Sequence, residues 1–126
     1  MTPKKILIVD NQAYVRLLVE QSLQDLEDEG VELLMAEDGE EALEVVRSKK
    51  PDLMILDIMM PKIDGFEVCD RVKHQMGMGD VFVIILTARG MDVDHQRGRE
   101  VGADEYMTKP FDPVTLLDTA RQVLGL

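Results

Sequence analysis

The sequence contains no tryptophan, and only 4% of its 126 residues are aromatic. Its single cysteine, Cys69, excludes an internal disulfide. The chain has only two histidines in addition to this cysteine, so it has few of the ligands that a zinc site uses. Basic residues are also scarce, because 14 Lys and Arg stand against 25 Asp and Glu and give a formal net charge of −11. This balance argues against broad nucleic-acid binding, which requires clustered Lys and Arg.

Long apolar runs and low-complexity tracts are missing as well. The opening residues, MTPKK, are followed by an apolar run of only four residues at 6–9, which is too short for a signal-peptide core or a membrane span. With one cysteine and no such segment, we expect a cytoplasmic protein with no membrane partner. The hydrophobic content of 45% and the charged content of 31% are typical of one globular domain, which we expect over residues 1–126.

Apolar runs of strand length occur five times along the chain. They are ILIV at 6–9, VELLMA at 31–36, LMIL at 53–56, VFVIIL at 81–86 and the weaker EYMT at 105–108. Unbroken apolar runs are typical of parallel strands that are covered on both faces. We therefore expect a parallel sheet with helices on each side.

Segments with helical periodicity lie between and after these runs. The first of these segments ends near Gly30. One largely apolar stripe along it consists of Val15, Leu18, Val19, Ser22 and Leu26. Asp38 and Asp64 each stand three residues before a glutamate, and Asp112 stands directly before Pro113; both patterns are typical of helix starts. The order of strands and helices predicts a doubly wound α/β sandwich with right-handed crossovers.

The segment 92–101 is the poorest of the expected helices. It has few apolar residues, and its internal Gly98 costs on the order of 1 kcal/mol relative to alanine. Two interpretations remain open for it: a switching element of low stability, or an ordinary exposed helix.

Polar side chains end four of the five expected strands. Asp10 and Asn11 follow the first strand, Asp57 the third, Thr87 the fourth and Lys109 the fifth. In a doubly wound sheet the binding crevice lies beyond the carboxyl ends of the strands, so we expect these side chains to gather at one edge.

Asp57 has no evident structural purpose. Acids after strands often cap the next helix, but Asp57 is followed by the loop IMMPKIDG, in which Asp64 is the cap. A carboxylate at the mouth of a buried strand needs a compensating cation, and such a cost is usually retained for function. Oxygen ligands without imidazole or thiolate favour Mg²⁺, and a carboxylate beside Mg²⁺ and Lys109 predicts an aspartyl phosphate.

Taken together, these motifs resemble the receiver domain of two-component response regulators, including the single-domain chemotaxis members of that family. The resemblance runs from ILIVDN through PDLMILDIMMPKIDGFEV and VIILTARG to GADEYMTKPF, which is essentially the whole chain. It implies a flavodoxin-like fold, a (βα)5 three-layer sandwich with a five-stranded parallel sheet of order 2-1-3-4-5. It also implies a signalling protein and not an enzyme, with phosphoryl acceptance and slow autodephosphorylation as its only chemistry.

Carried over residue by residue, the resemblance implies that Asp57 accepts a phosphoryl group from a histidine kinase, a phosphotransfer protein or a small donor. The implied Mg²⁺ ligands are Asp10, Asn11, Asp57 and the backbone carbonyl of Met59. The family usually has a second acid where this chain has Asn11, whose amide oxygen can still coordinate. A unit charge pair at ~4 Å in an effective dielectric of 20 is worth roughly 4 kcal/mol before desolvation, so we expect weaker Mg²⁺ binding.

The resemblance also implies how the signal leaves the site. Thr87 and Lys109 would contact the phosphoryl oxygens, Tyr106 matches the switch aromatic, and the Lys109–Pro110 bond would be cis. The phosphoryl group would shift the surface made by the segments 92–101 and 105–108 and by the helix that starts at Asp112. A downstream protein would bind there, with no direct contact to nucleic acid, and the chain would be a monomer or a weak dimer.

Three alternative interpretations compete with this one. An aspartate-nucleophile phosphohydrolase usually has a second acid two residues after the nucleophile, but that position is Met59. A flavin carrier would need a phosphate loop rich in Ser, Thr and Gly, and DNQAYVR offers none. A receiver-like module that binds without phosphorylation is the third, because Asn11 replaces an acid. The chain ends at ARQVLGL, where a receiver fold would be complete, so a single-domain regulator and a piece of a longer one both remain open.

Overall fold

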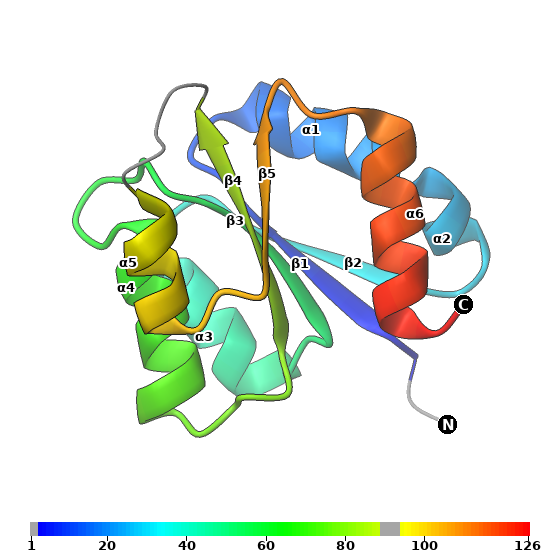
Figure 1. Cartoon of the computed structure of the whole chain (residues 1–126). Helices are drawn as coiled ribbons and strands as arrows, with labels where there is room; N and C mark the ends of the chain where they lie inside the picture. The colour runs from blue at the N-terminus through cyan, green and yellow to red at the C-terminus, as the bar shows by residue number, and fades with distance from the viewer. Residues whose placement is uncertain (1–2, 89–93) are drawn as a thin grey trace.

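In the computed structural model, which describes residues 3–88 and 94–126, five strands form one parallel sheet (Figure 1). The strands are β1 (Lys5–Val9), β2 (Glu32–Ala36), β3 (Leu53–Asp57), β4 (Phe82–Ala88) and β5 (Glu105–Lys109). Their order across the sheet is β2-β1-β3-β4-β5, and every neighbouring pair is parallel. The predicted fold class and strand order are confirmed.

Helices cover both faces of the sheet and make three layers (Figure 1). On one face lie α1 (Ala13–Ser22), α2 (Gln24–Asp28) and α6 (Pro113–Leu124). On the other lie α3 (Gly39–Lys49), α4 (Gly65–Asp70), the π-helical segment η1 (Arg71–Gln75) and α5 (Asp94–Val101). Within the described residues no helix has both the length and the apolar character that crossing a membrane requires.

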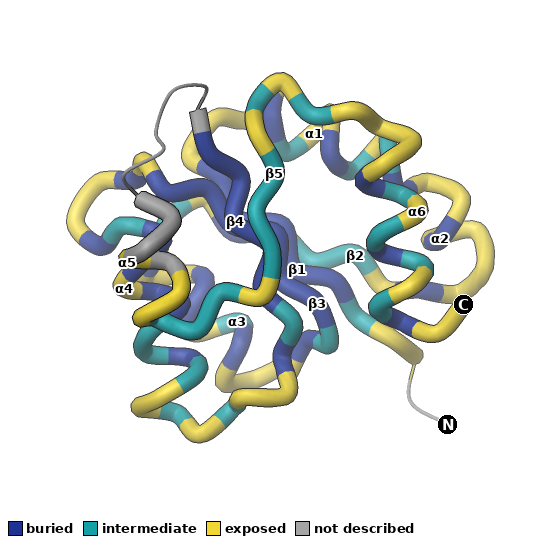
Figure 2. Tube along the Cα trace, in the orientation of Figure 1, coloured by how far each residue is buried: buried dark blue, intermediate teal, exposed yellow. Residues whose placement is uncertain are grey.

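The sheet is buried on both faces, as its unbroken apolar runs predict. Successive residues of β1 point to opposite sides: Ile6 and Ile8 pack beneath α1 and α6, while Leu7 and Val9 pack beneath α3 and α4. The strands β1, β3 and β4 at the centre of the sheet are the most deeply buried part of the molecule (Figure 2). The candidate functional residues at the ends of these strands therefore lie next to the buried core.

Three helix starts follow the sequence pattern. The side chains of Asp38, Asp64 and Asp112 accept hydrogen bonds from the backbone N–H groups of Glu41, Glu67 and Val114, at 2.8, 2.9 and 3.1 Å. Each bond satisfies a backbone donor that the first turn of a helix leaves unpaired. The predicted caps are confirmed.

The first helix differs from its prediction. The chain leaves the helical conformation at Leu23, with φ −103° and ψ 10°, so the expected single helix consists of α1 and the short α2. Val15, Val19 and Leu26 of the predicted stripe are buried, but Leu18 is 48% exposed. Leu18 is one position away from Val19, a rotation of about 100° around the helix, so it lies beside the buried face and not on it.

On the other face, one expected helix ends differently from its prediction and one is found where it was expected. The helix that begins at Asp64 continues beyond α4 as the π-helical segment η1, which nothing in the sequence signals. The helix expected over 92–101 is found as α5 from Asp94, and residues 92 and 93 lie outside the described residues.

Candidate functional site

Asp10 lies immediately beyond β1 and is almost completely buried, with 1% of its surface exposed. Its backbone N–H donates to the carbonyl of Ala36, 3.2 Å away, and so extends the pairing of β1 with β2. One carboxylate oxygen, Oδ1, accepts from the backbone N–H of Gln12 at 2.9 Å. These two bonds fix the carboxylate at the carboxyl edge of the sheet.

Asp57 is the last residue of β3 and is 5% exposed. Lys109, the last residue of β5, extends past β4 toward β3 and β1. Its Nζ donates to Asp10 Oδ2 and to Asp57 Oδ1, each at 2.9 Å. Three strand ends that are distant in the sequence thus place two carboxylates on one ammonium group.

The ionisation of this cluster follows from burial and mutual charge. Burial raises the pKa of Asp57, and the nearby charge of Asp10 raises it further, against the lowering effect of hydrogen bonds from Lys109 and the Met59 backbone. Burial alone would lower the pKa of Lys109, but hydrogen bonds to Asp57 and Asp10 outweigh it and raise that pKa. The ammonium therefore stays charged between two carboxylates.

Backbone connections around the two acids were not predicted from the sequence. Arg16 Nη1 donates to the backbone carbonyl of Asp10 at 2.6 Å, which ties α1 to the end of β1. A Cβ built on Gly65 would stand 2.3 Å from the carbonyl oxygen of Asp57, so only glycine fits there. The sequence predicted Asp64 as a helix cap, but it gave no hint of this contact.

Thr87 and Tyr106 lie on adjacent strands near the acids. Thr87 is 5% exposed in β4, one residue beyond Leu86, which is the register partner of Asp57. Tyr106 in β5 is partly buried beside Ile85, its register partner in β4. The Lys109–Pro110 bond is cis, as the resemblance implied.

Asn11 and Met59, the remaining predicted metal-site residues, follow the buried acids and lie at the surface. Asn11 is exposed, and 65% of Met59 is exposed. Over residues 3–88 and 94–126 no group of three or more His, Cys, Asp or Glu side chains is placed to hold a metal ion. The donors present at this edge are carboxylate, amide and backbone carbonyl oxygens, which is the chemistry that Mg²⁺ prefers.

A groove of about 670 Å³ runs beside the cluster, between α1 and the connection that leads from β5 to α6. Lys109 and Pro110 form part of one wall, and Tyr14 and Leu18 belong to the other. The groove therefore places apolar side chains next to the charge cluster.

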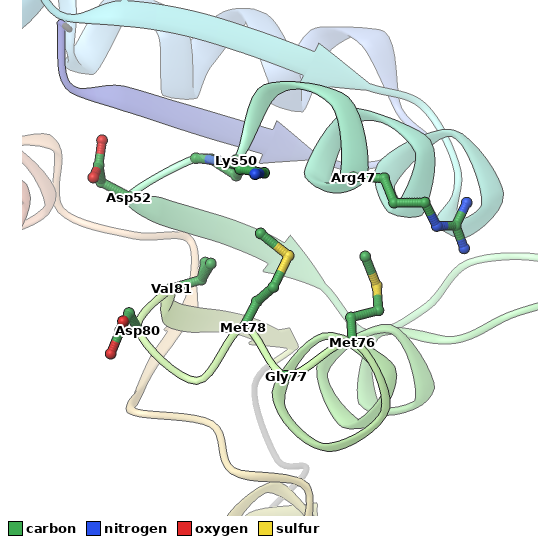
Figure 3. A pocket seen from close by; sticks show the side chains of 9 residues that line it. Arg47, Lys50, Asp52, Met76, Gly77, Met78, Asp80 and Val81 are labelled. Atoms are coloured by element: carbon green, nitrogen blue, oxygen red, sulfur yellow. The ribbon is translucent and has the colours of Figure 1, made fainter.

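A second hollow lies at the opposite edge of the sheet, where β3 and β4 begin (Figure 3). It is lined by Arg47 of α3, by residues 50–52 before β3, and by residues 76–78, 80 and 81 before β4. Figure 3 shows Met76 and Met78 rising from the η1–β4 connection toward α3. Its charged residues are not buried, so this hollow lacks the feature that distinguishes the Asp57 edge.

Comparisons with known proteins show which family the chain belongs to. The chain is 44% identical over 110 residues to the alkaline phosphatase synthesis transcriptional regulatory protein PhoP of Bacillus subtilis, covering 87% of this chain and 44% of that protein. It is 41% identical over 124 residues to the phosphate regulon transcriptional regulatory protein PhoB of Pseudomonas aeruginosa, covering 98% and 53%. The chain spans about half the length of the curated relatives that it matches.

Solved structures give the same result. The Vibrio cholerae chemotaxis protein CheY4 superimposes with a TM-score of 0.85 at 35% identity, covering 97% of this chain and 99% of that one. The Thermotoga maritima response regulator DrrB gives a TM-score of 0.83 at 31% identity, covering 98% and 54%. Residues 6–121 match the sequence family described as the response regulator receiver domain. This chain therefore belongs to the response regulator receiver family of two-component signalling proteins.

Proposed function

We propose that this chain is a phosphorylation-dependent switch in which Asp57 accepts a phosphoryl group. The observation that carries the proposal is the contact of Lys109 Nζ with both Asp10 and Asp57 at 2.9 Å. It supplies a cation beside a carboxylate that is 5% exposed and that caps no helix. Packing alone gives no reason for a charge at this position, so its burial cost is explained by chemistry.

The chemistry that we assign to the cluster is attack by Asp57 on a phosphohistidine. A carboxylate oxygen of Asp57 forms a bond to phosphorus as the phosphorus–nitrogen bond of the donor breaks, and the leaving imidazole nitrogen keeps the electron pair. Lys109 then pairs with oxygens of the transferred group, and the Thr87 hydroxyl hydrogen-bonds to them. Catalysis rests on positioning and charge, because the protein takes no other covalent part.

A magnesium ion belongs to this proposal, since the oxygen donors at the site suit a hard cation. The residues that would hold it are Asp10, Asn11, Asp57 and the backbone carbonyl of Met59. When bound, the ion would neutralise part of the charge on the phosphoryl group. The backbone N–H of Gln12 donates to the Asp10 carboxylate and so helps to orient it toward the site.

The partners follow from the reaction. We assign the donor role to a histidine kinase or a phosphotransfer protein, which must bring its phosphohistidine close to Lys109. Tyr14, Leu17 and Leu18 expose 63, 50 and 48% of their surface on α1, beside the groove that Lys109 lines. Such an exposed apolar patch is typical of a protein-binding surface, and it supports docking of the donor there.

Phosphorylation would change the surface that α5, β5 and α6 form. A phosphoryl group adds about −1.5 to −2 charges at neutral pH, which draws Thr87 and Lys109 inward and shifts a pre-existing equilibrium of this surface. Tyr106 would act as the switch aromatic, and a downstream protein would bind the shifted surface. We further propose that residues 1–126 act as one cytoplasmic receiver domain, monomeric or weakly dimeric, without direct contact to nucleic acid.

The test is the intact mass of the protein after incubation with acetyl phosphate over a range of Mg²⁺ concentrations. We expect one added phosphoryl group in the wild type and none in Asp57→Asn. Asp52→Asn is the matched control, because Asp52 precedes the amino end of the same strand and its Oδ2 only accepts from the backbone N–H of Lys5. No adduct at any Mg²⁺ concentration would overturn the proposal and favour a module that binds without phosphorylation.

The role of Asn11 is tested by adding back the missing charge. Asn11→Asp should lower the Mg²⁺ concentration for half-maximal phosphorylation at least about tenfold, which corresponds to ~1.4 kcal/mol of the Coulomb energy available at this distance. Gln12→Glu adds the same charge one residue further on and should change that concentration less than about threefold. Equal Mg²⁺ dependence in the wild type and Asn11→Asp would remove Asn11 from the metal site.

A further inference from the structure

The helix α5 is attached to the protein by unusually little apolar surface. Its sequence, DHQRGREV, contains one large apolar residue, Val101, and it packs chiefly against α4. A helix of eight residues is not stable by itself in water, so its position depends on a few specific contacts.

Arg97 makes two of these contacts with α4. Its Nη1 lies 3.5 Å from Asp64 Oδ2, and its Cζ lies 4.9 Å from the centre of the Phe66 ring. The ion pair is weak by itself, because 55% of the Arg97 side chain and 37% of the Asp64 side chain are exposed. The buried ring adds a planar surface for the guanidinium, so the two contacts together hold it in one place.

The residue between the two partners of Arg97 lies against the backbone of Asp57 and Ile58. Between Asp64 and Phe66 stands Gly65, whose N–H donates to the carbonyl of Ile58 at 3.0 Å and whose missing Cβ leaves room for the Asp57 carbonyl. The other oxygen of Asp64, Oδ1, caps α4 through the N–H of Glu67 at 2.9 Å. The first turn of α4 therefore contacts the end of β3 through Gly65 and contacts Arg97 through Asp64 and Phe66.

The far end of α5 is held separately. The Cys69 Sγ lies 3.5 Å from the carbonyl of Val101, and Lys73 Nζ pairs with Asp104 Oδ2 at 2.7 Å. Cys69 itself is fully buried, and burial raises the pKa of its thiol to about 12, so it acts as a core residue. These contacts tether the C-terminal end of α5, and Arg97 restrains the turn that precedes it.

We propose that Arg97 is a positioning residue that couples α5 to the phospho-acceptor segment 57–65 through Asp64 and Phe66. A change at Asp57 is passed through the backbone contact with Gly65 to the first turn of α4, and from there to the guanidinium of Arg97. This route is distinct from the one through Thr87 and strand β4. The regulatory part of the inference rests on the proposed phosphorylation of Asp57.

The test is amide hydrogen exchange of α5 peptides, measured in the free protein and after phosphorylation with acetyl phosphate and Mg²⁺. In Arg97→Ala we expect exchange in α5 to be at least about threefold faster in the free protein, with the response to phosphorylation lost. Asp64→Asn keeps a good helix cap but removes the charge, and should give a smaller change in the same direction. Arg97→Lys keeps the ion pair without the planar contact and should restore part of the response.

Arg99→Ala is the matched control, because Arg99 is an exposed arginine of the same helix. Equal α5 exchange in Arg97→Ala and Arg99→Ala would show that the contacts of Arg97 do not restrain α5. An unchanged response to phosphorylation in Arg97→Ala would show that Arg97 does not couple α5 to the segment 57–65. A merely structural role would speed exchange equally in both states and leave their difference intact.

A double-mutant cycle keeps this test independent of the proposed function. Asp57→Asn changes the acceptor without any phosphoryl group, and it should alter α5 exchange at least about twofold in the presence of Arg97 but not in Arg97→Ala. If the wild type takes up no phosphoryl group, the proposed function fails while the cycle still decides the coupling. An additive cycle would overturn the inference even in a protein that is phosphorylated normally.

Discussion

The two edges of the sheet use charged residues in opposite ways. At the carboxyl edge, Asp10 and Asp57 are 1% and 5% exposed and bind the ammonium of Lys109. At the amino edge, Arg47 and Lys50 are exposed and line the hollow in Figure 3. Charges at the amino edge are therefore solvated, while those at the carboxyl edge depend on each other.

This difference indicates that the buried charges at the carboxyl edge lower the stability of the folded protein. Removing a carboxylate from water is unfavourable, and even a well-paired buried ion cluster is often no more stable than apolar residues of the same size. The cluster at the carboxyl edge is thus poorly explained by stability, whereas the exposed charges of the amino edge need no further explanation. Substitutions at the two edges can test the contrast directly.

The largest effect is expected from Lys109→Met. Without the ammonium, two buried carboxylates face each other unpaired, and the free energy of unfolding at pH 7 should fall by about 3 kcal/mol. The loss should shrink on acidification, because protonation removes the repulsion between the carboxylates. Urea denaturation between pH 4.5 and 7.5 measures both effects. Lys50→Met is the control at the amino edge, and an equal loss in both variants would contradict the contrast.

A smaller effect of opposite sign is expected from Asp57→Asn. Because the pKa of Asp57 is raised in the folded protein, the folded state binds this proton more tightly than the unfolded chain does. At pH 7 ionised Asp57 therefore destabilises the wild type, and the variant should melt about 3 °C higher. This advantage should disappear as the pH falls through the raised pKa toward the ordinary value of 3.8. Thermal unfolding at several pH values checks the sign, and an advantage that does not depend on pH would contradict it.

The smallest effect is expected at the amino edge. Arg47 lies exposed at the end of α3, and Arg47→Gln removes its charge while keeping a side chain of good helix propensity. The free energy of unfolding should change by less than about 0.5 kcal/mol, as is usual for surface substitutions. The same urea titration measures it. A loss comparable to that of Lys109→Met would show that charge at this edge is also needed for folding.

Much of the fold was predictable because local signals agreed with the tertiary structure. The unbroken apolar runs gave the strands of a sheet covered on both faces, and the caps Asp38, Asp64 and Asp112 gave three helix starts. The exposed Leu18 and the break at Leu23 were missed, because apolar periodicity alone does not tell which side of a stripe the sheet covers.

Parts of the candidate site could not be predicted for a related reason. Three contacts join residues that no sequence pattern links. They are the contact of Gly65 with the carbonyl of Asp57, the hydrogen bond from Arg16 to the carbonyl of Asp10, and the contact of Arg97 with the Phe66 ring. Only backbone packing makes them neighbours. The roles of Thr87, Tyr106 and Asn11 remain predictions, and the Mg²⁺ titration of Asn11→Asp tests the last of them.

The sequence by itself determined the strand ends and their chemistry: an acid after the first strand, an acid after the third and a lysine after the fifth. Hydrophobic runs and turn residues are local, so their positions can be read without knowing the fold. Only the tertiary structure decided that one ammonium lies 2.9 Å from both carboxylates and that Arg97 rests on the first turn of α4. Those distances depend on how strands and helices pack across the whole sheet, and no local pattern encodes them.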